Sequence, residues 1–240
     1  MSDAEHHEHS GQAERGTETP SSSARFVPAA GRFVPTALYD RSIALTMRED
    51  RWRPLLVRQL VAAVPPGGRI VDVGAGTGTL ALAVAVARPD VEVLAFDGDP
   101  EALALAEAKP GAERVDWRPG LAGHLDLADA RADAVVMSLV LHHLGPAAKR
   151  GALRDVRRIL RPGGQLHVAD WGRPATPLLR AGFLALQLAD GFEGTRDHAA
   201  GRLPVFLNEA GFDHVRRYRR LRTVWGSLEL LGARSIVTPR

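Results

Sequence analysis

The segment from Ile70 to Gly78 reads Ile-Val-Asp-Val-Gly-Ala-Gly-Thr-Gly, which joins a short apolar run to a glycine-rich turn. The run is β-branched and follows Pro65-Pro66-Gly67-Gly68, so it predicts a buried parallel strand, and the alanine-rich residues after Gly78 predict a helix. Glycines allow such a strand to turn tightly and let its backbone contact a ligand, where a Cβ atom would obstruct one or the other. The turn therefore predicts a nucleotide-cofactor site.

The spacing of the glycines discriminates between cofactors. Dinucleotide-binding loops follow the pattern G-x-G-x-x-G, which would require a glycine where this chain has Thr79. The pattern here is D-x-G-x-G-x-G, with Asp72 beside the turn. A cofactor that carries a sulfonium and an amino acid group tolerates that carboxylate better than a pyrophosphate does, because a pyrophosphate is anionic. Asp97 ends a second apolar run, where a carboxylate can accept hydrogen bonds from ribose hydroxyls. These features favour S-adenosylmethionine over NAD.

Four blocks of sequence then occur in a fixed order. They are the glycine turn, Phe96 to Pro100 (Phe-Asp-Gly-Asp-Pro), Asp133 to Leu144, and Leu160 to Leu166 (Leu-Arg-Pro-Gly-Gly-Gln-Leu). In this order and spacing the chain resembles the class I S-adenosylmethionine-dependent methyltransferases, most of all the small-molecule branch that includes quinone-biosynthesis C-methyltransferases. The resemblance runs from about residue 36 to the C-terminus. It implies a fold and a cofactor but does not specify a substrate.

The resemblance implies which residues bind the cofactor. The glycine turn supplies Asp72, Gly74, Ala75 and Gly76, and the loop after the second strand supplies Asp97 and Gly98. Members of the family commonly place an aspartate after the third strand to bind the adenine amino group, but the matching position here is Leu121. We expect the backbone amides of Leu121 and Ala122 to hold the adenine ring instead. Ser138, at the end of the fourth strand, completes the predicted set.

His142 and His143 follow the fourth strand and are the candidate catalytic residues. Methyl transfer from a sulfonium requires mainly that nucleophile, methyl group and sulfur be aligned, and the leaving group departs neutral. A base is useful only when the nucleophile carries a proton, and histidine is the side chain best suited to remove it near neutral pH. Alternatively, one histidine is a packed helix-start residue and the other a polar group on the pocket wall. We expect no metal site, and the histidines of the N-terminal tail lack a spaced set of partner ligands.

Composition agrees with one enzyme domain. The chain has 240 residues, of which 45% are hydrophobic and 25% charged, so it can bury a full core. Cysteine is absent, which excludes disulfides and the methyltransferases that use a covalent cysteine adduct. The sequence shows no apolar run of membrane-spanning length and no signal peptide, so we expect a cytoplasmic protein without membrane insertion. The oligomeric state is not predicted.

The chain divides into three predicted regions. We expect a disordered tail over 1–24, a helical lid across the cofactor mouth over 25–66, and the cofactor-binding domain over 67–240. Strands are expected near 69–73, 91–96, 113–117, 132–138, 164–170, 213–219 and 222–231. Helices are expected near 78–88, 100–108, 146–160, 174–190 and 203–210, with a loop over 190–193. The fold class is thus α/β and Rossmann-like, a doubly wound, mostly parallel seven-stranded sheet. By resemblance, its antiparallel last strand lies between the fifth and sixth.

Arginine dominates the cations, and one cluster, from Arg216 to Arg222, is dense. The net charge is +3, a mild excess, so we interpret the cluster as a strand with exposed arginines and do not expect nucleic acid as a partner. The predicted substrate is a small molecule methylated at oxygen, carbon or nitrogen. An RNA methyltransferase is the first alternative, although the Asn-Pro-Pro-Tyr and Asp-Pro-Pro-Tyr tetrapeptides are missing. A scaffold that binds the cofactor without methylating, such as a pericyclase, is the second.

Overall fold

A computed structural model describes residues 46–236, and the predicted tail and the first half of the predicted lid, 25–45, lie outside the described residues. The elements follow one another as α2 (Glu49–Ala62), β1 (Arg69–Val73), α3 (Thr79–Ala87), β2 (Glu92–Asp97), α4 (Pro100–Glu107), the 3₁₀ turn η2 (Ala112–Arg114), β3 (Val115–Pro119), β4 (Ala132–Ser138), the 3₁₀ turn η3 (Leu141–His143), α5 (Pro146–Ile159), β5 (Leu160–Gly172), α6 (Pro177–Asp190), α7 (Phe192–Ala199), α8 (Leu203–Glu209), β6 (Phe212–Thr223) and β7 (Gly226–Ser235). Strand and helix alternate through most of this order, as the sequence predicts.

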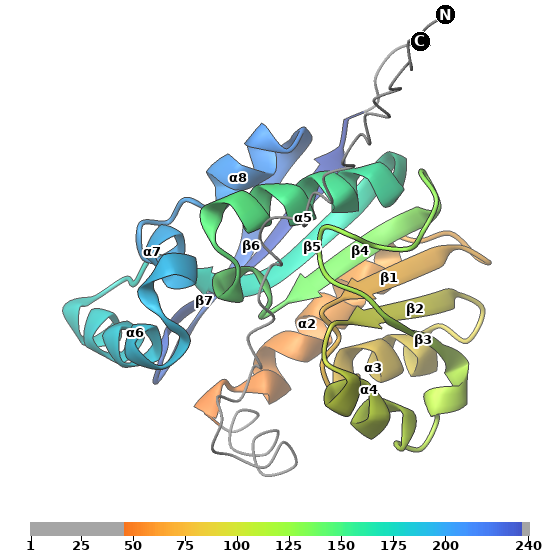
Figure 1. The fold of residues 1–240 in the computed structure, drawn as a ribbon, viewed down its shortest axis with the longest axis horizontal. Helices are drawn as coiled ribbons and strands as arrows, with labels where there is room; N and C mark the ends of the chain where they lie inside the picture. Colours follow the sequence, from red (N-terminus) through yellow and green to blue (C-terminus); the bar gives the residue numbers. More distant parts are fainter. Residues whose placement is uncertain (1–45, 237–240) are drawn as a thin grey trace, which may run out of the picture.

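The strands form one seven-stranded sheet in the order β3-β2-β1-β4-β5-β7-β6 (Figure 1). The neighbouring pairs among the first five strands are parallel, and β7 runs antiparallel to both β5 and β6. The insertion of an antiparallel last strand between the fifth and sixth is therefore confirmed. The strand order reverses between β1 and β4, and ligands of open α/β sheets bind beyond the carboxyl ends of the strands at such a point.

Helices cover both faces of the sheet and enclose two apolar cores. In Figure 1, α2, α3 and α4 lie on one face, and α5 and α8 lie on the other. Neighbouring residues of β1 point to opposite sides, so that Ile70 joins the core beneath α2 and α3 while Val71 joins the core beneath α5 and α8. The strands β1, β2, β4 and β5 are consequently mostly buried on both faces, whereas β3 is partly exposed, and the carboxyl ends of the four buried strands are held at one edge.

Two helices begin where the sequence carries strong start signals. Asp99 caps α4 by accepting a hydrogen bond from the Glu101 amide at 2.9 Å, and Pro100 occupies the first turn. Thr176 caps α6 by accepting one from the Leu179 amide at 3.3 Å, and Pro177 follows. These caps fix the helix starts that lead away from β2 and β5.

The segment after α6 differs from the prediction. We expected a loop over 190–193, but Asp190 ends α6 and Phe192 already begins α7 after a single glycine at positive φ. Gly194 and Thr195 inside α7 have low helix propensity, which conceals this helix in the sequence. Packing stabilises it: a Cβ atom at Gly194 would lie 2.0 Å from the carbonyl oxygen of His142, so α7 sits directly against η3.

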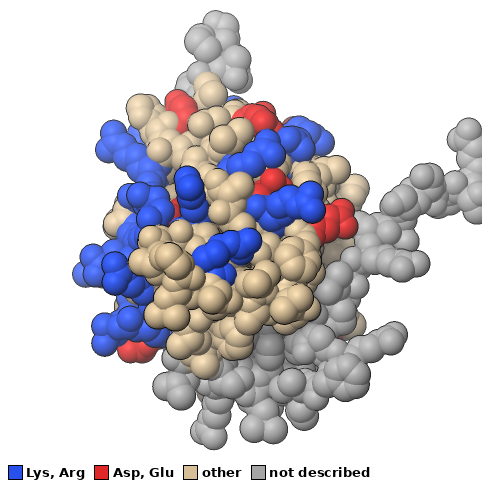
Figure 2. Space-filling view, turned by 90° about the vertical axis from the view of Figure 1, so that its left-hand side faces the viewer, with Lys and Arg blue, Asp and Glu red and all other residues tan. Residues whose placement is uncertain are grey.

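The arginine cluster lies in a strand, as predicted, but this strand, β6, extends to Thr223 rather than 219, and β7 begins at Gly226 rather than 222. Among the described strands β6 is the last of the sheet, and Arg217 and Arg220 pair with the carboxylate of Glu229 on β7. Figure 2 views the molecule from the side that carries α6 and α7, and there Lys and Arg side chains are spread over much of the face with few acidic ones between them. Within residues 46–236, no helix has both the length and the apolar character needed to cross a bilayer.

Candidate functional site

The glycine turn after β1 has the backbone geometry that requires glycine. Gly74, Gly76 and Gly78 have φ angles of +75°, +55° and +76°. A Cβ atom at Gly74 would lie 2.3 Å from the Val140 side chain, and one at Gly78 would lie 2.3 Å from the Trp117 ring. At Gly76, by contrast, a Cβ atom would meet nothing within 4 Å. The outer two glycines thus permit packing, and the middle one leaves open space over the turn for a ligand.

Hydrogen bonds hold this turn against the end of β2. The amides of Gly74 and Ala75 donate to the carbonyl oxygen of Phe96 at 2.8 and 3.0 Å. The Gly76 amide donates to Asp97 Oδ2 at 2.6 Å, and the Asp99 amide donates to Asp97 Oδ1 at 2.8 Å. The Asp97 carboxylate is therefore fixed in orientation. It keeps lone pairs that ribose hydroxyls could use, since an ionised carboxylate accepts about four hydrogen bonds.

Asp72 is the most unusual charge at this edge. Its residue is 2% exposed, and neither carboxylate oxygen has a hydrogen-bond partner within residues 46–236. Burial raises the pKa of Asp72 from 3.8 to about 7; the negative charge of Asp97 adds to the rise, and Arg53 opposes it. A buried carboxylate without partners is matched by a cationic ligand, so Asp72 fits a cofactor with a sulfonium and an ammonium group.

The remaining predicted cofactor residues lie around the same edge. Gly98 follows Asp97, and the Gly120 amide donates to the Asp97 carbonyl oxygen at 2.9 Å, which ties the loop after β3 to the end of β2. In that loop Leu121 is 39% exposed and Ala122 is partly buried. Ser138 is half-buried at the end of β4, next to the switch in strand order. The open Gly76 position, the orphaned Asp72 carboxylate and the oriented Asp97 carboxylate together fit S-adenosylmethionine.

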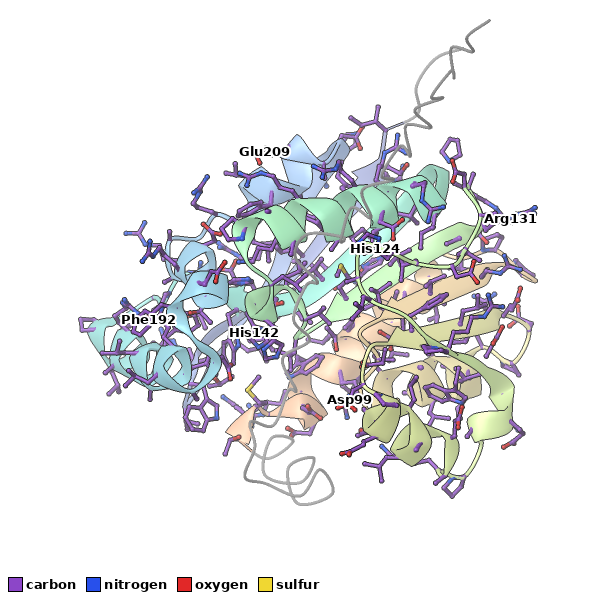
Figure 3. All side chains as sticks on the ribbon, in the orientation of Figure 1. Asp99, His124, Arg131, His142, Phe192 and Glu209 are labelled. Atoms are coloured by element: carbon purple, nitrogen blue, oxygen red, sulfur yellow. The ribbon has the colours of Figure 1, made fainter. Side chains whose placement is uncertain are left out.

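The residues after β4 have a strained backbone. Leu139 has φ +58°, a left-handed conformation that branched or bulky residues rarely adopt, and its amide donates to the carbonyl oxygen of Ala169 on β5 at 2.8 Å. Such strain persists where surrounding contacts enforce it, often at functional sites. This turn brings η3, with His142 and His143, to the carboxyl edge of the sheet, where Figure 3 also places Asp99.

Asp170 is the residue that organises the two histidines. It is fully buried in β5 and accepts hydrogen bonds from the Leu141 amide at 2.8 Å, the Trp171 amide at 2.7 Å and His142 Nδ1 at 2.8 Å. Burial alone would raise the pKa of Asp170, but His142, His198 and these hydrogen bonds together hold it below its usual value. Asp170 is thus an anion, and His142 Nδ1 carries the proton of their shared hydrogen bond.

The two histidines differ in their surroundings. Their ring centroids are 3.9 Å apart. Burial lowers the pKa of His143 from 6.5 to about 3, so this imidazole is neutral and weakly basic. His142 Nε2 lies 3.6 Å from Asp190 Oδ2 at the end of α6. Burial raises the pKa of Asp190, an effect that His142 opposes.

Sequence reasoning missed part of this cluster. Trp171, which follows Asp170 in β5, is 1% exposed and packs against Phe183 in the core. His198 was not predicted; its Nδ1 donates to the Trp171 carbonyl oxygen at 2.7 Å and lies 3.7 Å from Asp170. A polar residue inside an apolar strand, such as Asp170, is the sequence signal that could have indicated a buried partner.

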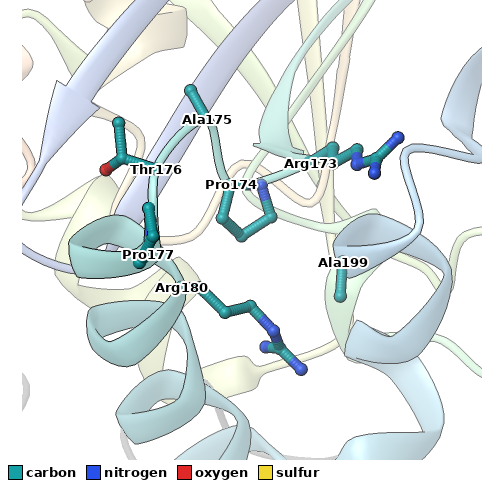
Figure 4. A pocket seen from close by; sticks show the side chains of 7 residues that line it. All are labelled: Arg173, Pro174, Ala175, Thr176, Pro177, Arg180 and Ala199. Carbon is teal, nitrogen blue, oxygen red and sulfur yellow. The ribbon is translucent and has the colours of Figure 1, made fainter.

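A pocket of about 400 Å³ lies outside the end of β5, between the start of α6 and the end of α7 (Figure 4). Its lining consists of Arg173, Pro174, Ala175, Thr176, Pro177, Arg180 and Ala199. None of the predicted site residues lines it. The guanidinium group of Arg180 donates to Gln187 Oε1 at 2.7 Å and is therefore engaged in a contact within α6.

Comparison with known proteins identifies the family. A family described as "Methyltransferase domain" matches residues 70–164, which include the glycine turn, Asp97 and both histidines. An uncharacterised methyltransferase of Synechocystis is 30% identical over 187 residues, covering 78% of this chain and 84% of the relative. The arsenite methyltransferase of Halobacterium salinarum is 37% identical over 113 residues, which are 45% of this chain and 28% of that protein.

A ubiquinone/menaquinone biosynthesis C-methyltransferase of Syntrophotalea carbinolica is 34% identical over 133 residues, 55% of this chain and 54% of the relative. The chain thus spans about a quarter of the arsenite enzyme and about half of the quinone enzyme. Among solved structures, the YcgJ protein of Bacillus superposes with a TM-score of 0.63 at 17% identity, over 77% of this chain and 97% of the other, which shows a shared fold. With this fold, this site and these relatives, the chain belongs to the class I S-adenosylmethionine-dependent methyltransferases.

Proposed function

We propose that this protein transfers a methyl group from S-adenosylmethionine to an oxygen, carbon or nitrogen atom of a small-molecule metabolite, with His142 as the base. The observation that carries the proposal is the buried Asp170–His142 pair, which lies at the same edge of the sheet as the open glycine turn. The cofactor supplies an electrophilic methyl group on a positively charged sulfur. The residues of this chain must hold that cofactor, present the acceptor atom to it and remove the acceptor's proton.

The cofactor side uses the turn after β1 and the end of β2. Asp72, ionised by a neighbouring cation, offsets the positive charge of the ligand, and Asp97 accepts from the ribose. Gly76 leaves room for close approach of the ligand. The exposed side chain of Leu121 would cover one face of the adenine ring, and the amides of Leu121 and Ala122 would donate to its edge.

The acceptor side uses His142 rather than His143. Because ionised Asp170 accepts from His142 Nδ1, the neutral imidazole has its free lone pair on Nε2, where it can take a proton from a hydroxyl or an acidic carbon. His143, with a pKa of about 3, is too weak a base near neutral pH. We assign His143 to the wall of the acceptor site.

The names of relatives and the charge of the surface support a small-molecule substrate. The names of two relatives refer to arsenite and to ubiquinone and menaquinone biosynthesis, which concern small molecules. RNA is the less favoured substrate, because Arg217 and Arg220 of the arginine strand already pair with Glu229.

Labelled S-adenosylmethionine and fractionated metabolites test the proposal, with mass spectrometry to locate the transferred methyl group. Once an acceptor is found, single-turnover rates are measured between pH 5.5 and 9. We expect His142→Ala to lower the rate by roughly 10²–10⁴-fold and to remove the ascending limb of the pH profile, with little change in cofactor affinity. His143→Ala is expected to be milder, and His124→Ala, at an exposed position, serves as the control.

Three outcomes count against parts of this assignment. Near-wild-type rates in both site variants would remove the histidines from proton transfer and leave alignment as the source of catalysis. A larger defect in His143→Ala would reverse their roles. Tight cofactor binding without turnover of any fraction would favour the non-methylating scaffold.

A further inference from the structure

Three potential metal ligands converge beside the proposed base. One nitrogen of His142, one nitrogen of His143 and one carboxylate oxygen of Asp190 lie within 4.8 Å of one another. The histidines belong to η3 and Asp190 ends α6, so residues more than forty positions apart in the sequence contribute to the cluster. We propose that His142, His143 and Asp190 bind a divalent transition-metal ion of the zinc type.

The donor set determines the class of ion. Two imidazoles and one carboxylate suit Zn²⁺, Co²⁺ or Ni²⁺, whereas Mg²⁺ and Ca²⁺ prefer oxygen ligands. Ligands at 2.0–2.1 Å from a tetrahedral zinc are about 3.3 Å from each other. The observed 3.6 Å between His142 Nε2 and Asp190 Oδ2 is close to that separation. Rotation of the side chains could close the remaining distance to His143.

The surroundings of His142 match those of a metal-binding histidine. Such a histidine donates its other ring N–H to a carboxylate or carbonyl, which fixes the tautomer and the ring orientation. Here His142 Nδ1 donates to Asp170, and Asp170 is itself held by the amides of Leu141 and Trp171. The lone pair of the neutral ring is then on Nε2, the atom that lies 3.6 Å from Asp190 Oδ2.

The atoms that would bind the metal ion make no strong hydrogen bonds among the described residues. The separation of 3.6 Å is too long for a hydrogen bond between His142 and Asp190, and His143 Nδ1 is buried without a partner among the described residues. Asp190 keeps 19% of its side chain exposed, which gives an ion a path from solvent. Three protein ligands leave a coordination position open.

One consequence rests on the proposed function. A metal ion on His142 Nε2 occupies the lone pair that would accept the acceptor's proton, so the ion and the base reaction exclude each other. We therefore expect zinc to inhibit methyl transfer, and the cluster to act as a metal-sensitive control point on the enzyme.

Binding is measured first, on the full chain without cofactor or substrate. Zn²⁺ is titrated against a chromogenic chelator, and Co²⁺ is followed by its visible absorption. Because His6, His7 and His9 could also chelate metal, all titrations are repeated in a His6→Ala/His7→Ala/His9→Ala background. We expect one equivalent to bind in that background, with no competition from Mg²⁺ in excess.

Variants then locate the site. We expect Asp190→Asn to weaken zinc binding at least tenfold and Asp170→Asn to weaken it by about 10–100-fold. Asp126→Asn, at an exposed position, is the matched control. Cofactor affinity verifies that each variant is folded. If Asp170→Asn does not fold, zinc binding by Asp190→Asn alone decides whether the metal site exists. Absence of stoichiometric binding, or binding unchanged in Asp190→Asn, would overturn the metal site.

The inhibition is tested separately, as the rate at fixed Zn²⁺ relative to each variant's own rate without it. Loss of inhibition in Asp190→Asn supports the proposal. If zinc binds and accelerates the reaction, the site stands and His142 is not the base. If no methyl transfer is detected, the titrations still decide whether the metal site exists.

Discussion

Replacing Asp72 with asparagine is expected to stabilise the ligand-free protein at alkaline pH. The carboxylate is buried in β1, and neither of its oxygens has a hydrogen-bond partner within residues 46–236. Burial, assisted by Asp97, raises its pKa in the folded state to about 7, compared with 3.8 for an ordinary aspartate. Asparagine has a similar shape but no charge, so it removes the cost of burying an anion.

The sign of the pH dependence follows from this raised pKa. The folded state binds the proton more tightly than the unfolded chain does, so the stability that the protonated group contributes is fully present below pH 3.8. It is lost as pH rises through about 7. Above that pH the cost approaches about 4 kcal/mol, because each pKa unit corresponds to about 1.4 kcal/mol. At pH 5 the cost is less than half as large.

Denaturant unfolding of ligand-free wild type and Asp72→Asn at pH 5 and pH 8.5 measures the effect. We expect the variant to gain about 2–4 kcal/mol at pH 8.5 and clearly less at pH 5. Asp50→Asn, at an exposed position, controls for a general charge effect. An equal gain at both pH values, or a loss at pH 8.5, would refute the reasoning that Asp72 is a buried and unpartnered anion.

Cofactor binding should change in the opposite direction. A positively charged ligand favours ionised Asp72, so wild-type affinity for S-adenosylmethionine is expected to rise between pH 6 and pH 8. In Asp72→Asn the affinity should be lower and should lose this dependence. Calorimetry at several pH values measures both, and a rise of equal size in the variant would assign the titration to another group.

Further substitutions test the other contacts. Gly76→Val should abolish binding of S-adenosylmethionine in calorimetry, because the valine side chain fills the open space over the turn. The protein should stay folded, since valine at φ +55° adds a backbone strain of only about 1–2 kcal/mol. Unchanged affinity would show that the turn does not contact the ligand. Asp97→Ala should weaken the affinity for S-adenosylmethionine at least tenfold, because charge-assisted hydrogen bonds to the ribose are lost. If the wild type bound NAD more tightly than S-adenosylmethionine, the cofactor assignment would be wrong. Gly194→Ala should lower the melting temperature by several degrees, because its Cβ atom would lie 2.0 Å from the His142 carbonyl oxygen, and a melting temperature equal to wild type would show that α7 does not pack so closely on η3.

The fold could be predicted because local pattern and global topology agree along most of the chain. The strand at Arg69–Val73 and the strand at Ala132–Ser138 have the predicted bounds. β5 begins at Leu160 rather than at 164, because Leu160 pairs with Ala132 before the register shifts at the following turn. That pairing joins residues far apart in the sequence, so the local pattern of apolar residues does not predict it.

Some residues of the candidate site could also be predicted from the sequence, and others could not. The glycine turn and Asp97 are recognisable because backbone geometry demands their residue types at a fixed spacing. The partnership of Asp170 with His142 joins residues 28 positions apart, and Asp190 approaches from a helix whose packing the sequence does not reveal. Burial, which sets the pKa of Asp72 and of His143, likewise arises only when the chain is folded.

The arginine row on β6 bears on how copies of this protein meet in solution. An outer strand presents backbone groups that can pair with another chain and so extend a sheet from molecule to molecule. Two copies approaching along β6 would bring five arginines from each into close contact, offset in each copy by Asp213 of β6 and Glu229 of β7. The repulsion discourages aggregation through this edge. It weakens as salt shortens the reach of the charges, so concentrated protein should stay dispersed best at low ionic strength.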